Sequence, residues 1–439
     1  MIRALVLSAF AMVATGGTAI AGAADGPQQL CRTRSGEILQ ALHGGDYAAA
    51  TMHFDATLAT HLDAERLAQV WALLPAQFGA YKDAGTATVE AGDKVFLART
   101  PMHFARGDLS LNVACSAGGD VVSLSVTPVQ AAAAPVAANE HEIAVPSPLG
   151  PLPGLLTLPA GDGPFPAVLL VAGSGPNDRD ETIGPNKPFR DLAQGLAAAG
   201  IASLRYDKRS HVYGGRIAAN TQLTIDEEVT DDALTALRLL AREPHIDAHH
   251  LFVLGHSLGA IMAPRIGRRD PHVAGLVLMA AAPTLDLDIV IRQMRYLLPQ
   301  QGLTPAQVDA NVAPIIAMRD TIARADPAHP PAGNFFNAPA SYWLSLRDYN
   351  AIKVSKGLSM PMLVLQGSGD FQVSPTADFG QWQAAFAHDP RVRLIEYPGL
   401  SHLFMPAGDP PSPADYARPA HVDAGVIHDI AQWIHDHDA

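Results

Sequence analysis

The segment from Leu251 to Ala260 constrains the fold more than any other part of this sequence. It reads LFVLGHSLGA, an apolar run followed by Gly-x-Ser-x-Gly and by residues that can begin a helix. This order is typical of a nucleophile elbow, in which a strand turns sharply into a helix and leaves a serine, here Ser257, on the turn. Gly255 and Gly259 fit positions where a Cβ would clash. The chain has 37 glycines, so the five letters alone also fit an ordinary loop, and the interpretation needs a base and an acid.

Length and composition indicate a globular protein with two domains. A chain of 439 residues is too long for one small core, and 48% hydrophobic with 17% charged residues excludes a disordered chain. The net charge is −13, and no cluster of Lys and Arg marks a phosphate-binding face, so we expect no nucleic-acid partner. The oligomeric state stays open between monomer and dimer.

The first 23 residues have the organisation of a secretory signal peptide. Arg3 gives a short positive start, residues 4–14 are apolar, and the small residues at 19–21 or at 21–23 fit a cleavage site. The apolar run is short for a membrane span and breaks at Gly16. We therefore expect export to the periplasm or beyond, without a stable membrane anchor.

Two cysteines, Cys31 and Cys115, lie in the N-terminal part of the chain. Exported proteins meet an oxidising compartment, so we predict a Cys31–Cys115 disulfide. Neither cysteine has a CxxC partner or a nearby His, which argues against redox catalysis and metal binding.

Residues 24–130 predict a small α+β domain. Apolar residues at helical spacing, strongest over 63–78, give way to alternating strand patterns at 94–98, 109–113 and 121–126. The segment 131–139, low in complexity, predicts a linker. No recognisable catalytic cluster lies in this first domain.

From residue 140 to residue 439 the pattern alternates between strands and helices. Strands are predicted at 167–171, 201–206, 251–254, 273–279, 362–365 and 392–397, and helices at 189–199, 225–242, 258–268, 377–387 and 424–435. This alternation predicts an α/β domain whose mostly parallel sheet is covered on both faces. Between the strands ending near 280 and starting at 362 lie about eighty residues, far more than a crossover needs, so an inserted helical cap is predicted over about 284–355.

His402 is the best candidate for the base that Ser257 requires. A serine hydroxyl is a poor nucleophile at neutral pH, and the chain offers 18 histidines. His402 follows a strand through a short loop, at the carboxyl end where open α/β sheets place their active sites. The acid that orients this base is assigned to Asp370, which also follows a strand. Asp286 is the rival, although it opens a helix, where an Asp is a good cap.

The oxyanion that forms during acyl transfer needs two hydrogen-bond donors. One is the backbone N–H of Leu258, directly after the nucleophile. The second is assigned to the N–H of Ser174, with Gly175 as the alternative, because this glycine-rich loop follows the first central strand.

Charged residues on neighbouring loops, including Arg179 and Arg209, are interpreted as ion pairs that fix those loops, although a contact of either arginine with substrate stays open. No cluster of residues has metal-ligand spacing, and the Gly-rich loop lacks a P-loop lysine or a full dinucleotide fingerprint. We therefore expect no metal and no cofactor.

Five segments in this order resemble the serine esterases and aminopeptidase-like enzymes of the α/β-hydrolase superfamily, and most of all exported bacterial two-domain carboxylesterases with a small N-terminal domain. The segments are residues 173–181, 205–209, 255–259, 369–373 and 401–404. The resemblance implies an α/β-hydrolase fold with a triad of Ser257, Asp370 and His402 and activity on short-chain acyl esters. Ser210-His211 stands where a glycine is usual, which leaves the shape of that loop open.

The leading hypothesis is a serine carboxylesterase acting on a small-molecule ester. The alternative is a peptidase or amidase that uses the same triad, because the cap decides access; Tyr342 and Trp343 are candidate pocket walls, with core packing favoured for both. Export disfavours a thioesterase for coenzyme A esters. A binding protein associated with the envelope, with the hydrolase fold as scaffold, is a further alternative that an intact triad argues against.

Overall fold

The computed structural model describes residues 25–92, 95–105, 107–129, 135–336 and 338–438. The fold divides into two compact units. The first is Met1–Ala131 with the short segments Ile183–Asn186 and Tyr416–Pro419, and the second is the remainder of the chain. The predicted signal peptide, residues 1–23, lies outside the described residues, as does the start of the predicted linker. Within the described ranges, no helix combines the length and apolar character that crossing a membrane requires.

The first unit consists of helices followed by an antiparallel sheet, as predicted. Its helices are α1 (Asp25–Gly44), α2 (Tyr47–Thr51), α3 (Ala56–His61) and α4 (Ala64–Phe78), and its strands are β1 (Tyr81–Ala84), β2 (Thr88–Ala91), β3 (Val95–Phe104), β4 (Gly107–Ser116) and β5 (Val121–Pro128). The sheet has the order β1-β3-β4-β5, and β2 also pairs with β3. Asp55 and Asp63 cap α3 and α4, each accepting a backbone N–H of the first turn.

The predicted disulfide is present. Cys31 of α1 and Cys115 of β4 are bonded, with their Cα atoms 5.6 Å apart and a sequence separation of 84. Both residues are completely buried. The bond therefore ties the first helix to the central strands of the sheet inside the core of this unit.

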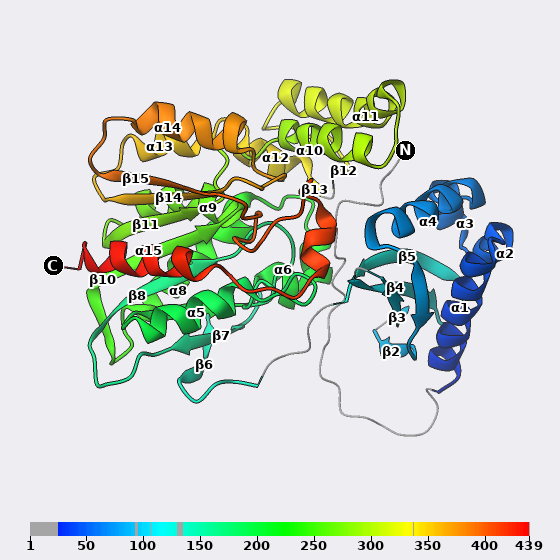
Figure 1. The fold of residues 1–439 in the computed structure, drawn as a ribbon, viewed down its shortest axis with the longest axis horizontal. Helices are drawn as coiled ribbons and strands as arrows, with labels where there is room; N and C mark the ends of the chain where they lie inside the picture. The colour runs from blue at the N-terminus through cyan, green and yellow to red at the C-terminus, as the bar shows by residue number, and fades with distance from the viewer. Residues whose placement is uncertain (1–24, 93–94, 106, 130–134, 337, 439) are drawn as a thin grey trace. The chain divides into compact units, whose positions relative to one another are not determined.

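The second unit is built on an eight-stranded sheet in the order β15-β14-β11-β10-β8-β9-β7-β6 (Figure 1). The strands are β6 (Glu140–Val145), β7 (Leu152–Thr157), β8 (Phe165–Val171), β9 (Ala202–Tyr206), β10 (Ile246–His256), β11 (Val273–Met279), β14 (Met362–Gly367) and β15 (Val392–Tyr397). All neighbouring pairs from β9 to β15 are parallel, whereas β7 is antiparallel to both β6 and β9. The predicted strands are all present, and β6 and β7 extend the sheet beyond them.

Helices cover both faces of this sheet (Figure 1). They are α5 (Pro188–Ala198), α6 (Arg209–Val212), α7 (Gly214–Ala218), η1 (Asp226–Thr230), α8 (Asp231–Leu240), α9 (Leu258–Arg269), η2 (Pro375–Phe379), α14 (Gly380–Phe386) and α15 (Ala424–His435). A further short helix, η3 (Pro413–Ala417), precedes α15 in the chain. On β10, Phe252 packs edge-on against Trp433 of α15, with ring centroids 5.9 Å apart. Its neighbours Leu251 and Val253 belong instead to the core cluster that includes α8 and α9. This alternation, which follows from the two-residue period of a strand, buries the central strands on both sides.

The long interval between β11 and β14 is largely helical. It holds α10 (Leu287–Gln300), α11 (Pro305–Arg324), α12 (Ala340–Leu346) and α13 (Ala351–Ser355), with a two-stranded ribbon of β12 (Asn334–Phe335) and β13 (Ala338–Pro339). Its last helical stretch is divided into the two short helices α12 and α13. Helix α10 reaches the loop after β14, since the Tyr296 ring stacks on that of Phe371 and Gln293 Nε2 donates to the carbonyl of Gln372.

Candidate active site

Ser257 occupies the turn between β10 and α9. Its backbone has φ 52° and ψ −116°, a conformation that residues with a side chain rarely adopt. Its N–H donates to the carbonyl of Met279 on β11, at 2.9 Å. A Cβ on Gly255 would collide with the backbone of Gly259, and a Cβ on Gly259 would collide with the carbonyl of Val171. The two glycines are therefore required by crowding at the turn.

His402 and Asp370 lie in contact. The Nδ1 atom of His402 is 2.7 Å from Oδ2 of Asp370, and both side chains are buried. His402 follows β15 and Asp370 follows β14, so neighbouring parallel strands bring the two together at their carboxyl ends. An imidazole whose Nδ1 faces a carboxylate carries its proton there and leaves Nε2 free to accept another.

Further donors hold the Asp370 carboxylate in place. Its Oδ1 accepts the backbone N–H groups of Gln372 and Val373, at 2.8 and 2.9 Å, and its Oδ2 also accepts from Gln366 Nε2 at 3.0 Å. The rival Asp286 serves a different purpose, because its carboxylate caps α10 by accepting the N–H groups of Asp288 and Ile289. The structure thus pairs His402 with Asp370 and places Asp286 at a helix start.

The glycine-rich loop after β8 lies against the elbow. A Cβ built on Gly173 would stand 3.2 Å from the Cβ of Ser257. The N–H of Gly173 is already bonded to Glu181 Oε1, at 2.6 Å, so it is not free to bind an oxyanion. Ser174 and Gly175 follow and are exposed. Leu258 is the first residue of α9, and a helix has no internal acceptor for the N–H of its first residue.

A buried pair of His256 and Glu181, which the sequence analysis did not identify, connects these parts. His256 Nδ1 is 3.0 Å from Glu181 Oε1, and its Nε2 is 2.9 Å from the carbonyl oxygen of His402. Burial opposes protonation of this imidazole, but the charge and hydrogen bond of Glu181 outweigh it and raise the pKa of His256. Because both partners only accept, both ring nitrogens of His256 must donate for both bonds to form. No signal in the sequence relates positions 75 residues apart.

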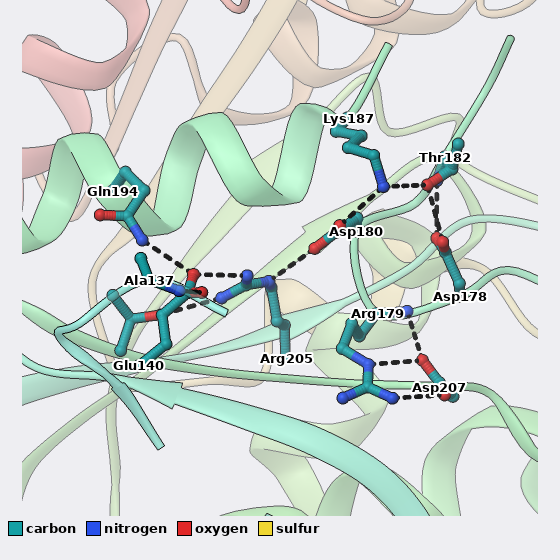
Figure 2. Close-up of polar contacts among 11 residues, drawn as sticks. Ala137, Glu140, Asp178, Arg179, Asp180, Thr182, Lys187, Gln194, Arg205 and Asp207 are labelled. Carbon is teal, nitrogen blue, oxygen red and sulfur yellow. Dashed lines mark hydrogen bonds and ion pairs between the residues drawn. The ribbon is translucent and has the colours of Figure 1, made fainter. Parts of the chain in front are cut away.

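The arginines on the loops near this edge form ion pairs, as interpreted from the sequence. Arg179 binds both carboxylate oxygens of Asp207 at 3.0 Å, and Arg209 does the same with Asp232 at 2.6 Å. Figure 2 shows the first of these pairs. Ser210 and His211 form part of the short helix α6, which settles the shape of the loop that departs from the family pattern.

The deepest ion pairs surround Arg205 of β9. Its guanidinium donates to Glu140 at 2.7 Å and to Asp180 at 2.9 Å (Figure 2). It also donates to the Thr157 hydroxyl at 2.8 Å. Lys187 completes the group with an ion pair to Asp180 at 3.0 Å. These contacts attach the loop that carries residues 177–181 to strands β6, β7 and β9.

Metal ions have no evident place here: within the described ranges, no group of three or more His, Cys, Asp or Glu side chains is arranged to hold one.

The strand order of the sheet, with a serine elbow after β10, an acid after β14 and a histidine after β15, is that of an α/β-hydrolase. The family described as "Serine aminopeptidase, S33" matches residues 187–409, which is half of the chain. The chain belongs to this family of hydrolases.

The chain is also similar to individual proteins. Esterase EstD of Thermotoga maritima is 34% identical over 385 residues, covering 85% of this chain and 88% of the relative. Esterase FrsA of Klebsiella pneumoniae is 29% identical over 139 residues, which is 31% of this chain and 30% of the relative. Among solved structures, Est1E from Butyrivibrio proteoclasticus has a TM-score of 0.43 at 12% identity, covering 67% of this chain and 99% of that one.

Proposed function

We propose that the protein is a serine carboxylesterase that cleaves short-chain esters through an acyl-enzyme on Ser257. The observation that carries the proposal is the His402–Asp370 pair, whose His402 accepts a hydrogen bond from His256 of the strained serine elbow through its backbone carbonyl. The 34% identity to an esterase over most of both chains supports esters as the substrate class.

In the first half of the reaction, Ser257 Oγ attacks the ester carbonyl and His402 Nε2 takes the hydroxyl proton. Asp370 holds the Nδ1–H of His402 and stabilises the imidazolium that results. The carbonyl oxygen becomes an oxyanion that accepts from the N–H groups of Leu258 and Ser174. The ester C–O bond then breaks, and the alcohol leaves with the proton from His402.

In the second half, water attacks the acyl-enzyme and gives its proton to His402. The same two donors bind the second oxyanion, and the carboxylic acid leaves as Ser257 regains its proton. The reaction consumes only the ester and one molecule of water.

Replacement of the nucleophile tests this mechanism. Ser257→Ala is expected to remove p-nitrophenyl acetate turnover and the burst that an acyl-enzyme gives. Ser110→Ala, a serine on β4 of the first unit, is the matched control and should keep full activity. Full turnover by Ser257→Ala would refute the mechanism.

A peptidase or amidase with the same triad is the second candidate, because the matching family is described as a serine aminopeptidase. A series of p-nitrophenyl esters of increasing acyl length, measured beside aminoacyl p-nitroanilides, separates the two. Faster turnover of the aminoacyl p-nitroanilides than of the p-nitrophenyl esters would show that the protein is a peptidase and would refute the esterase proposal.

We also propose that the protein is exported. The organisation of residues 1–23 and the buried Cys31–Cys115 disulfide support this, since such bonds persist in oxidising compartments. N-terminal sequencing of the mature protein from a bacterial host is expected to begin at Gly22 or Ala24, after the small-residue sites. A mature chain that retains Met1 in the cytoplasm would contradict export.

A further inference from the structure

The peptide that joins Gly173 to Ser174 is held from one side by a buried lysine. Lys208 Nζ donates to the carbonyl of Gly173 at 2.9 Å, and Asn177 Nδ2 donates to the same oxygen at 3.0 Å. The N–H of Gly173, in the preceding peptide, is held by Glu181. Both peptides that meet at Gly173 are therefore fixed by polar side chains.

This contact decides the direction of the Ser174 N–H. A trans peptide is planar, and its C=O and N–H point to opposite sides. The carbonyl of Gly173 and the N–H of Ser174 belong to one such plane. When Lys208 holds that carbonyl, the Ser174 N–H must point away from Lys208. If the Gly173–Ser174 peptide were reversed, the carbonyl oxygen of Gly173 would face the oxyanion, where an N–H donor is needed.

The surroundings of Lys208 are unusual for a lysine that only stabilises the fold. Its side chain is 5% exposed and forms an ion pair with Glu228 at 2.8 Å. Removing a lysine from water is costly, and a buried ion pair can often be replaced by apolar residues without loss of stability. The ammonium group donates a hydrogen bond to the Gly173 carbonyl, which an apolar side chain could not do.

The loops themselves are joined so that Lys208 stays in register with Gly173. The N–H of Lys208 donates to the carbonyl of Asn177 at 3.0 Å. The N–H of Arg179 donates to Asp207 Oδ1 at 2.8 Å, beside the side-chain pair of the same residues (Figure 2). Asn177, Arg179, Asp207 and Lys208 thus form the support of one peptide plane.

We propose that Lys208 is a positioning residue for the oxyanion hole: it orients the Gly173–Ser174 peptide so that the Ser174 N–H faces the reacting carbonyl, and its charge strengthens that N–H as a donor. This inference rests on the esterase mechanism proposed above. In that mechanism Lys208 contacts neither the substrate nor Ser257, and it acts only through the Gly173–Ser174 peptide.

Two variants test the proposal, Lys208→Met and the double variant Lys208→Met/Glu228→Gln. The double variant leaves no unpaired buried charge and carries the test if the single variant does not fold. Loss of a whole oxyanion donor costs about 100- to 1,000-fold in kcat, so a donor that is present but poorly aimed should cost about 10- to 100-fold. Because the oxyanion exists only in the transition state, KM for p-nitrophenyl acetate should stay close to that of the wild type.

Binding of an alkyl trifluoromethyl ketone gives a readout that a purely structural role would not move. Ser257 adds to this ketone, and the resulting hemiketal oxygen is an anion in the oxyanion hole. The affinity of both variants for the ketone should therefore fall by about the same factor as kcat. The control is Arg209→Met/Asp232→Asn, which removes a neighbouring buried ion pair that does not touch Gly173. It should lower the melting temperature but leave kcat and ketone affinity close to those of the wild type.

A wild-type kcat in the Lys208→Met/Glu228→Gln variant would overturn the proposal. Activity would then require only that no buried charge is left unpaired, and not the hydrogen bond from Lys208 to Gly173. Equal losses of kcat in the Arg209→Met/Asp232→Asn control would also overturn it. A wild-type protein that hydrolyses no ester would refute the proposed function instead, so the two failures are distinguishable.

Discussion

Replacement of Arg205 by Met should destabilise the second unit strongly and in a pH-dependent manner. The guanidinium is 1% exposed and joins Glu140 and Asp180. Removing one partner of a buried ion pair leaves uncompensated charge and costs about 3 to 5 kcal/mol. The value should lie toward the lower end, because Asp180 keeps Lys187 and Glu140 keeps the N–H of Ala137.

The pH dependence follows from the two carboxylates. Burial alone would raise the pKa of Glu140 and of Asp180, but Arg205 and the other donors outweigh it and hold both pKa values below the usual range. Depressed carboxylate pKa values contribute stability that is present above the unfolded values of about 4 and is lost as pH falls further. In Arg205→Met the carboxylates lose this benefit, so the deficit relative to wild type should be full at pH 7 and should shrink only as pH falls below about 4.

Urea unfolding followed by tryptophan fluorescence measures this deficit. Trp343, Trp382 and Trp433, three of the four tryptophans, lie in the second unit, so the signal reports mainly on it. Arg295→Met is the control, because the Arg295–Asp309 pair is exposed and such pairs contribute about 0 to 1 kcal/mol. A loss below about 1 kcal/mol in Arg205→Met at pH 7, or a deficit that shrinks already between pH 7 and about pH 5, would refute the reasoning about this buried pair.

Three further changes test other parts of the structure. Opening the Cys31–Cys115 bond with paired Ala substitutions should cost the first unit up to about 4.5 kcal/mol, the chain-entropy value for a loop of this length; an unchanged melting temperature would contradict it. Gly36→Ala, in the interior of α1 with no atom within 4 Å of the new Cβ, should instead stabilise this unit by up to about 1 kcal/mol, as thermal unfolding would measure. Glu181→Gln should remove the charge that raises the pKa of His256. A raised histidine pKa gives stability that is full below about pH 6.5 and is lost as pH rises through the folded value, so the wild-type advantage in melting temperature should be largest at low pH and shrink above it.

Sequence reasoning predicted the parts of this fold that depend on local pattern. The apolar strands that lead to Ser257, Asp370 and His402 have a regular alternation with helices, and parallel strands bring their carboxyl ends to one edge by geometry alone. Strand β10 is longer than the predicted 251–254. Its first five residues, 246–250, include Asp247, His249 and His250 and therefore lie outside the apolar run.

The parts that were missed depend on contacts between distant positions. Strand β7 contains Pro153 and Gly154, and β6 begins with the polar run 140–142, so neither has the pattern of a strand; pairing with β9 gives β7 its extended form. The contacts Lys208–Gly173 and Glu181–His256 span 35 and 75 residues. No periodicity encodes such separations, so only the three-dimensional structure could find them.

The place of the cap in the topology has a consequence for how specificity can change. Strands β11 and β14 are adjacent and parallel, so a short crossover could join them without α10, α11 and α12. We propose that the chemistry and the choice of substrate are carried by separable stretches of the gene: exchange of the cap for that of another hydrolase is expected to alter which acyl groups enter while the sheet and its reactive edge stay as they are. Diversification in such a protein can proceed by recombination at two neighbouring strand ends, with no change to the residues that react.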